Sequence, residues 1–172
     1  MNNLLELDAR LSQQLRLAED PGALRTLAGI LAHSGDSWFW LLGLGVCWLV
    51  GDAYWRELAG LLISGILVTA LIVMAIKFTV RRKRPEGELG SIYRRTDPHS
   101  FPSGHAARAV LLAVLALGAG PLWLACILLP WSVAVVLARV AMGLHYVSDV
   151  LAGAFIGILV GGIILITPMV MV

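Results

Sequence analysis

The stretch RTDPHSFPSGHAAR, residues 95–108, stands where a polar loop gives way to a long apolar run. A helix that begins here directs several unpaired backbone N–H groups at whatever lies in front of it, which favours an anion. Ser103 adds a hydroxyl, Gly104 allows close backbone approach, and His105 brings a titratable ring. Together these residues suit a phosphate group that undergoes chemistry.

The composition predicts an all-α integral membrane protein. The chain has 172 residues, of which 59% are hydrophobic and 14% charged, and its mean hydropathy is +0.84. A soluble fold of this size has no place for so much apolar surface. The net charge of +2 and the clustered basic residues argue against nucleic acid as a partner. Cys47 and Cys126 lie inside apolar runs without CxxC spacing, which indicates packing.

Residues 1–36 are expected to form two interfacial helices. No basic segment precedes an apolar one at the start, so we expect no cleaved signal peptide. Leucines recur at helical spacing from Leu4, which predicts an amphipathic helix along the membrane interface that ends near Asp20 and Pro21. The apolar piece from Ala23 to His33 is too short to cross a bilayer.

Residues 37–172 are expected to form the transmembrane core, and 1–172 a single membrane-embedded domain. Five spans are predicted from the apolar runs and the turn residues between them. They are Ser37 to Val50, Leu58 to Ile76, His105 to Gly120, Leu122 to Leu137 and Val150 to Ile166. Gly153, Gly157, Gly161 and Gly162 suit close packing of the last span against a neighbour.

Alternating spans would bring the end of the second, the start of the third, the end of the fourth and the start of the fifth to one side. Seven polar residues lie at these ends: Lys77, Arg84, Ser103, His105, Arg139, His145 and Asp149. A charged side chain costs about 2.5 to 3.5 kcal/mol at the bilayer centre on insertion scales, so buried charges call for partners or a function. The sequence therefore predicts one polar site at this side.

Three segments resemble the signature motifs of the type-2 phosphatidic acid phosphatase superfamily. They are Lys77 with Arg84-Pro85, the run from Pro102 to His105, and Arg139 with His145 and Asp149. That superfamily includes integral-membrane lipid phosphate phosphatases and vanadium haloperoxidases. The third motif usually has Ser before its Arg, and Ala138 stands there in this chain, a departure that concerns one auxiliary hydroxyl.

The residues also fit phosphate-ester hydrolysis on chemical grounds. The reaction needs positive charge on three equatorial oxygens, an in-line nucleophile and an acid for the leaving oxygen. Lys77, Arg84 and Arg139 supply the charge, and Ser103 with the backbone N–H of Gly104 completes the phosphate-binding cradle. This scheme requires no metal and no cofactor.

His145 is the expected nucleophile, because Asp149 lies four residues later and would orient its ring. The intermediate would be a phosphohistidine. His105 is the expected general acid, which protonates the departing alcohol and later helps to activate water. The resemblance implies the same roles for these three residues.

A site at helix ends with an apolar bundle below it favours an amphiphilic substrate, and membrane lipids are the expected surroundings. Undecaprenyl diphosphate, phosphatidylglycerol phosphate and phosphatidic acid all qualify, and no residue chooses among them. Two alternatives remain: a transporter, for which we find no repeat-related broken helices, and a non-catalytic lipid-phosphate-binding protein, which would not need both histidines. The sequence gives no signal of oligomeric state.

The expected location is the cell inner membrane, with several passes. Apart from Arg56, all Lys and Arg residues are expected on the site side, which by the positive-inside rule is cytoplasmic. Relatives in bacteria often face outward, and phosphate binding accounts for several of the charges, so we expect an active site at the periplasmic or outer face. Asp97 is left without an assigned role. Five further basic residues are interpreted as solvated loop charges or lipid-headgroup contacts: Arg81, Arg82, Lys83, Arg94 and Arg95.

Overall fold

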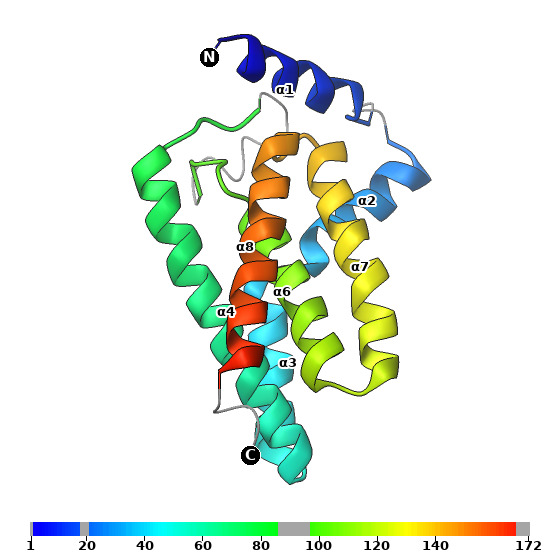
Figure 1. The fold of residues 1–172 in the computed structure, drawn as a ribbon. Helices are drawn as coiled ribbons and strands as arrows, with labels where there is room; N and C mark the ends of the chain where they lie inside the picture. Colours follow the sequence, from blue (N-terminus) through cyan, green and yellow to red (C-terminus); the bar gives the residue numbers. More distant parts are fainter. Residues whose placement is uncertain (1, 18–20, 86–96, 168–172) are drawn as a thin grey trace.

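The computed structural model describes residues 2–17, 21–85 and 97–167. Seven helices lie in these parts of the chain (Figure 1). They are α1 (Asn2–Gln14), α2 (Ala23–Ser34), α3 (Ser37–Val50), α4 (Ala53–Val80), α6 (Gly104–Ala119), α7 (Leu122–Ala141) and α8 (Val147–Ile166). The all-α fold predicted from the composition is confirmed.

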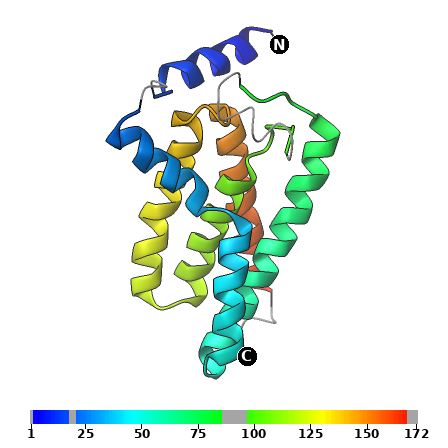
Figure 2. The ribbon, with the colours of Figure 1, turned by 180° about the vertical axis from the view of Figure 1, so that it is seen from behind.

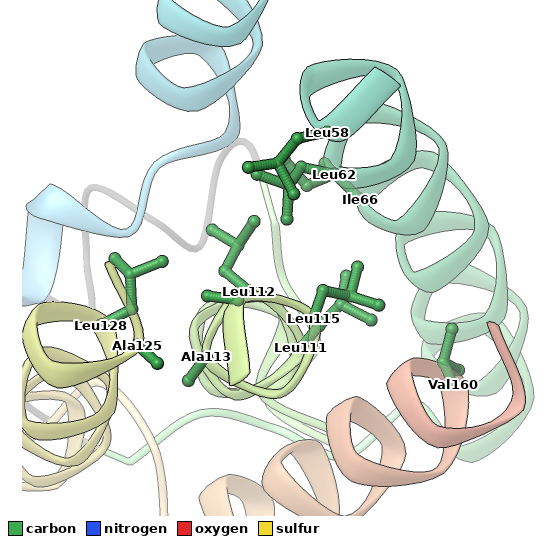
Figure 3. Packing of buried hydrophobic residues seen from close by; sticks show 11 residues of the cluster. Leu58, Leu62, Ile66, Leu111, Leu112, Ala113, Leu115, Ala125, Leu128 and Val160 are labelled. Atoms are coloured by element: carbon green, nitrogen blue, oxygen red, sulfur yellow. The ribbon is translucent and has the colours of Figure 1, made fainter. Parts of the chain in front are cut away.

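Helix α6 is the centre of the bundle and packs against α4, α7 and α8. Its small and branched residues allow close neighbours, and Leu111, Leu112 and Leu115 are completely buried. Figure 3 shows these leucines facing Leu58, Leu62 and Ile66 of α4, with Ala125 and Leu128 of α7 and Val160 of α8 around them. Burial of a leucine side chain contributes about 1.5 to 3 kcal/mol, so this cluster holds the four helices together.

Glycines bring the backbone of α8 against α6, as the sequence predicts. A Cβ atom at Gly153 would stand 2.3 Å from the Ser103 carbonyl oxygen, and one at Gly157 would stand 2.3 Å from that of Ala107. Both distances are far below van der Waals contact, so any side chain at these positions forces the helices apart. The prediction is wrong for Gly162, because no atom lies within 4 Å of a Cβ built there.

Substitution Gly157→Ala is expected to destabilise the fold by about 1 to 3 kcal/mol, as overpacking of a tight core does. The reason is the clash with the Ala107 carbonyl of α6. Thermal unfolding in detergent measures the change. Gly162→Ala is the matched control on the same helix and should leave the melting temperature unchanged or raised. Equal melting temperatures for the two variants would contradict the described packing.

The expected number of five spans is wrong, because two of the five expected helices are shorter than a membrane span. Among the described residues, three helices are long and apolar enough to cross a membrane: α4, α7 and α8. Helices α3 and α6 are apolar but have 14 and 16 residues. At about 1.5 Å per residue they fall short of the roughly 30 Å hydrocarbon core. Helix α6 is apolar because most of its residues pack inside the bundle, whereas α3 has no buried residue and is simply a short apolar helix.

Helices α1 and α2 lie at one end of the bundle, and α1 runs across that end (Figures 1 and 2). Helix α1 ends at Gln14, earlier than expected, and Asp20 of the expected boundary lies outside the described residues. Its leucines Leu4, Leu5, Leu7 and Leu11 are exposed, as is Leu15 directly after the helix. Such a face fits a helix at the membrane interface, and this location, like the single domain over 1–172, stays a prediction.

Candidate active site

Four helix ends lie toward the end of the bundle that α1 crosses: the end of α4, the start of α6, the end of α7 and the start of α8 (Figures 1 and 2). The structure thereby brings the predicted polar residues to one end of the bundle. Six of them are buried: Lys77, Arg84, Ser103, Arg139, His145 and Asp149. His105 and Gly104 are half-buried at the first turn of α6.

His145 lies in the loop between α7 and α8, and its ring is held from both sides. Nδ1 lies 2.8 Å from the backbone carbonyl oxygen of Ser100 and therefore donates to it. This assigns the proton to Nδ1 and leaves a lone pair on Nε2. Nη1 of Arg84 lies 3.1 Å and Nη2 of Arg139 lies 3.4 Å from Nε2. The lone pair thus faces the place where two guanidinium groups converge.

The environment of His145 keeps its imidazole neutral. Its side chain is 1% exposed, and burial lowers the pKa of the ring well below its ordinary value, with the positive charges of Arg139, Arg84 and Lys77 adding to the effect. A neutral ring with a free lone pair is the form that attacks phosphorus. The surrounding cations therefore both favour an anion and keep the His145 ring unprotonated.

The expected direct hydrogen bond between His145 and Asp149 is absent. The Asp149 carboxylate lies 3.6 Å from Nδ1, whereas the Ser100 carbonyl takes the hydrogen bond. One oxygen of Asp149 accepts from the backbone N–H of Tyr146 at 2.9 Å and so caps α8. Asp149 therefore stabilises the turn that carries His145 and places a negative charge behind its ring.

Arg82 is not a solvated loop charge, and that interpretation is wrong. Its Nη1 donates to Asp149 at 2.8 Å and its Nη2 to Asp8 of α1 at 2.7 Å, while the guanidinium lies over the Tyr146 ring at 3.9 Å. Asp8 also accepts from the backbone N–H of Ser148 at 3.0 Å. This network fastens α1 to the start of α8. Arg94 and Arg95 lie outside the described residues.

Asp97, which the sequence left unassigned, joins two of the cations predicted to bind phosphate. Its carboxylate oxygen Oδ2 accepts from Nζ of Lys77 and, at 2.8 Å, from Nη2 of Arg84. The Asp97 backbone carbonyl also accepts from Nε of Arg84 at 2.8 Å. A carboxylate here makes the charge-assisted contacts that a phosphate oxygen would make.

Removing the charge of Asp97 is therefore expected to strengthen phosphate binding. In Asp97→Asn the two cations lose an internal anion, and inhibition by vanadate or inorganic phosphate should improve about tenfold, the equivalent of one charged hydrogen bond. Inhibition constants of the purified protein measure this. Asp52→Asn, at the cap of α4 on the opposite end, is the matched control and should change nothing. Weaker inhibition in Asp97→Asn would show that Asp97 holds the cations in place.

Ser103 is the N-cap of α6, and its hydroxyl accepts from the backbone N–H of Ala106 at 3.4 Å. Beside it a cavity of about 270 Å³ opens between α3, α4 and α6. The cavity is polar at Lys77 and His105 and apolar farther along α4. Its lining comprises Ser37, Ile66, Thr69, Ala70, Val73, Met74, Lys77, Asp97, Gly104, His105 and Arg108.

Asp36 is not among the residues expected from the sequence, and its Oδ1 lies 2.5 Å from Nε2 of His105. Asp36 comes 69 residues before His105, and no local pattern links the two. Ser100 was missed for a related reason, because it contributes a backbone carbonyl. Ala138, in place of the usual Ser, is buried in an apolar cluster with Ala32 and Leu144.

No group of three or more His, Cys, Asp or Glu side chains is gathered for metal binding within the described parts of the chain. What gathers instead is a set of cations around a neutral imidazole, at the end of an apolar helical bundle. Such a set of cations suits an anion such as phosphate, and a neutral imidazole beside it suits a nucleophile. The sequence model of the PAP2 superfamily matches residues 53–170, and the chain belongs to that superfamily.

Known proteins agree with this assignment. The decaprenylphosphoryl-5-phosphoribose phosphatase of Mycobacterium tuberculosis is 34% identical over 163 residues, which cover 92% of this chain and 88% of that protein. The crystal structure of Aquifex aeolicus LpxE superposes with a TM-score of 0.74 at 26% identity, covering 92% of this chain and 94% of that one. The PAP2-type phosphatidylglycerolphosphate phosphatase of Bacillus subtilis gives 0.75 at 23% identity, over 95% and 85%, a likeness of fold.

The chain is therefore a lipid phosphatase of the PAP2 type and a membrane protein. The predicted resemblance and the predicted enzyme class are confirmed. A transporter or a non-catalytic binding protein no longer describes it.

Proposed function

We propose that the protein hydrolyses a phosphate ester of a lipid through a phosphohistidine formed on Nε2 of His145. The observation that carries this proposal is the convergence of Arg84 and Arg139 on that nitrogen, at 3.1 and 3.4 Å. The Ser100 carbonyl fixes the ring with its lone pair toward the same point. A phosphoryl group bound by the two guanidinium groups would have its phosphorus in reach of Nε2.

In the first step Nε2 attacks phosphorus and the bond from phosphorus to the lipid oxygen breaks. Lys77, Arg84 and Arg139 neutralise charge on the three equatorial oxygens, and the start of α6 at Gly104 adds backbone N–H groups. Asp97 gives up its contacts with Lys77 and Arg84 to the incoming oxygens. His105 protonates the departing oxygen, so that the lipid leaves as an alcohol.

In the second step water attacks the phosphorus of the phosphohistidine. His105, now neutral, takes a proton from the water, and the bond between nitrogen and phosphorus breaks. His145 regains its lone pair, and inorganic phosphate leaves. The enzyme returns to its starting protonation state without help from another group.

The proposed substrate is a polyprenyl-linked sugar phosphate, in which a terminal phosphate monoester is released. The support is the name of the mycobacterial relative, which acts on decaprenylphosphoryl-5-phosphoribose and matches this chain almost end to end. The cavity fits an amphiphile, since its polar end holds Lys77 and His105 and its apolar side runs along α4 past Met74 and Ile66. Undecaprenyl diphosphate, phosphatidylglycerol phosphate and phosphatidic acid are the competing substrates.

Phosphate release by the purified protein in mixed micelles tests the proposal, with each of these four lipids supplied at equal surface concentration. The highest kcat/KM is expected for the polyprenyl-linked sugar phosphate, and the chelator EDTA is expected to leave the rate unchanged. A higher kcat/KM on any of the other three lipids reassigns the substrate within the same mechanism. Loss of activity in EDTA overturns the metal-free mechanism, and no release from any lipid overturns the proposed reaction.

We also propose that the protein lies in the cell inner membrane with this site at the periplasmic or outer face. Helix α8 begins at the site and ends at Ile166 at the opposite end of the bundle (Figure 1). A reporter fused after the last residue should therefore be active in the cytoplasm. Reporter activity on the outer side would place the site in the cytoplasm.

A further inference from the structure

Asp36 occupies the N-cap position of α3 but does not cap that helix. Aspartate is among the most favoured N-cap residues because its carboxylate accepts from the first free backbone N–H groups. Asp52 does this for α4, where it accepts from Trp55 at 3.1 Å. The Asp36 side chain makes no such bond, and its Oδ1 instead lies 2.5 Å from Nε2 of His105. The Asp36 carboxylate therefore contacts a predicted active-site residue and not the backbone of α3.

The loop that carries Asp36 is fixed on both sides of it. Arg108, one turn after His105 on α6, donates from Nε to the Gly35 carbonyl at 2.9 Å and from Nη1 to the Ser37 hydroxyl. A Cβ atom at Gly35 would lie 3.3 Å from Cδ2 of His105, so the backbone passes directly against the ring. Residues 35 and 37 are therefore held to the helix that carries His105, and Asp36 between them has little freedom.

Neighbouring contacts extend this anchorage to α7. The indole N–H of Trp131 donates to the Ser34 hydroxyl at 2.9 Å, and that of Trp40 donates to the Ser34 carbonyl at 3.0 Å. Arg139 donates to the Ala32 carbonyl at 3.2 Å. A loop held by these contacts keeps the Asp36 carboxylate at a fixed distance from the His105 ring. A residue that positions another side chain needs such a fixed location.

The contact with Asp36 gives the two ring nitrogens of His105 different partners. Because Asp36 takes Nε2, only Nδ1 remains for the lipid oxygen that leaves. A carboxylate on one nitrogen stabilises the imidazolium form and fixes the ring plane, as aspartate does for the histidine of a hydrolase triad. The pKa of Asp36 is lowered by its hydrogen bond with His105, so the carboxylate is ionised at neutral pH.

We propose that Asp36 is the positioning residue of the general acid, directing Nδ1 of His105 toward the leaving oxygen and favouring the protonated ring against the surrounding cations. This inference rests on the proposed phosphatase mechanism and extends it to a residue outside the segment 53–170 that the family model matches. When the lipid oxygen departs, the Nδ1 proton moves to it, and the neutral ring keeps its Nε2 proton on Asp36. Water returns a proton to Nδ1 in the second step, so protons balance over the cycle.

Other charged and titratable groups also face this pair, and they bear on its pH dependence. They are His33 of α2, Lys77 of α4, Arg108 of α6, Arg139 of α7, and Asp97 and His145 of the loops. Burial and the positive charges of Arg139 and Arg108 lower the pKa of His105 below its ordinary value, which disfavours a protonated ring. Asp36 is the carboxylate in hydrogen-bond contact with His105 and so opposes that effect.

The test compares two leaving groups in Asp36→Asn, which keeps the shape and removes the charge. An alkyl phosphate needs a general acid, whereas 4-nitrophenyl phosphate has a leaving group that departs without one. We expect kcat for the lipid phosphate to fall about 10- to 100-fold with KM unchanged, and kcat for 4-nitrophenyl phosphate to fall less than about threefold. The alkaline limb of kcat on the lipid should move to lower pH, because the protonated ring loses its counter-ion.

Three further variants complete the experiment. Asp36→Ser keeps a capping side chain without the charge and should behave as Asp36→Asn does, and Asp52→Asn is the control with wild-type kinetics. The double variant with His105→Asn should be no slower than His105→Asn alone. Equal losses of kcat on both substrates, or full activity of Asp36→Asn, would overturn the role of Asp36. The proposed reaction would still stand in that case, provided that the wild-type protein is active. An inactive wild-type protein would instead overturn the proposed reaction.

Discussion

His145→Ala is expected to lower phosphate release by about 10⁴- to 10⁶-fold, the range seen when a covalent nucleophile is removed. The ring is the group that the Ser100 carbonyl orients and the Arg84 and Arg139 guanidinium groups face. Without it the bound phosphate still meets the cations but has no partner for covalent transfer. Vanadate and phosphate should therefore still bind, and the loss should appear in kcat.

A matched control is available at the same end of the bundle. The backbone of His99 forms an isolated β-bridge with Lys83, and its ring lies edge-on to the Phe78 ring. His99→Ala should retain turnover within about threefold, because the contact of this ring is with Phe78, which has no assigned role in the reaction. Turnover of His145→Ala comparable with that of His99→Ala would remove His145 from the chemistry.

Arg139→Ala is expected to lower kcat by about 10³- to 10⁵-fold, as loss of an arginine that stabilises a phosphoryl transition state does. Arg139 is fully buried, so its charge acts in a site with little water to screen it. Arg139→Lys keeps the charge and loses the two-pronged geometry. Its kcat should fall about 10- to 100-fold, the equivalent of one charged hydrogen bond.

Two readouts separate catalysis from folding in these variants. Arg139 also donates to the Ala32 carbonyl, so thermal unfolding in detergent must be measured beside kcat. Arg56→Ala removes an exposed arginine near the opposite end of α4 and is the control for loss of positive charge. If Arg139→Lys unfolded at the wild-type temperature and kept wild-type kcat, transition-state binding by Arg139 would be excluded.

The helices could be predicted from the sequence because each apolar run ends at a strong turn signal. Val50 is followed by Gly51 and Asp52, and Gly120 by Pro121, and the structure ends or begins helices beside each of them. The number of spans could not be predicted in the same way. An apolar run indicates burial but does not say in what, and most of α6 is buried against its neighbours in the bundle.

The sequence predicts those site residues that stand at helix ends with the spacing of the three motifs. Lys77, His105 and Arg139 come together because the helices that carry them alternate in direction. Asp36 and Arg82 were out of reach because their partners lie 69 and 67 residues away in other elements. Tertiary contacts of this kind leave no periodic pattern in the sequence. A backbone acceptor such as the Ser100 carbonyl does not even depend on which side chain stands there.

The most direct measurement is a rapid alkaline quench of the protein with lipid substrate labelled in its terminal phosphate, followed by peptide mass spectrometry. Covalent transfer predicts a label on the peptide that carries His145, stable in alkali and lost in acid, and absent from His145→Ala. In His105→Asn the label should still form from an activated aryl phosphate. Full turnover with no labelled peptide at any quench time, or with the label on another residue, would contradict phosphoryl transfer to Nε2 of His145.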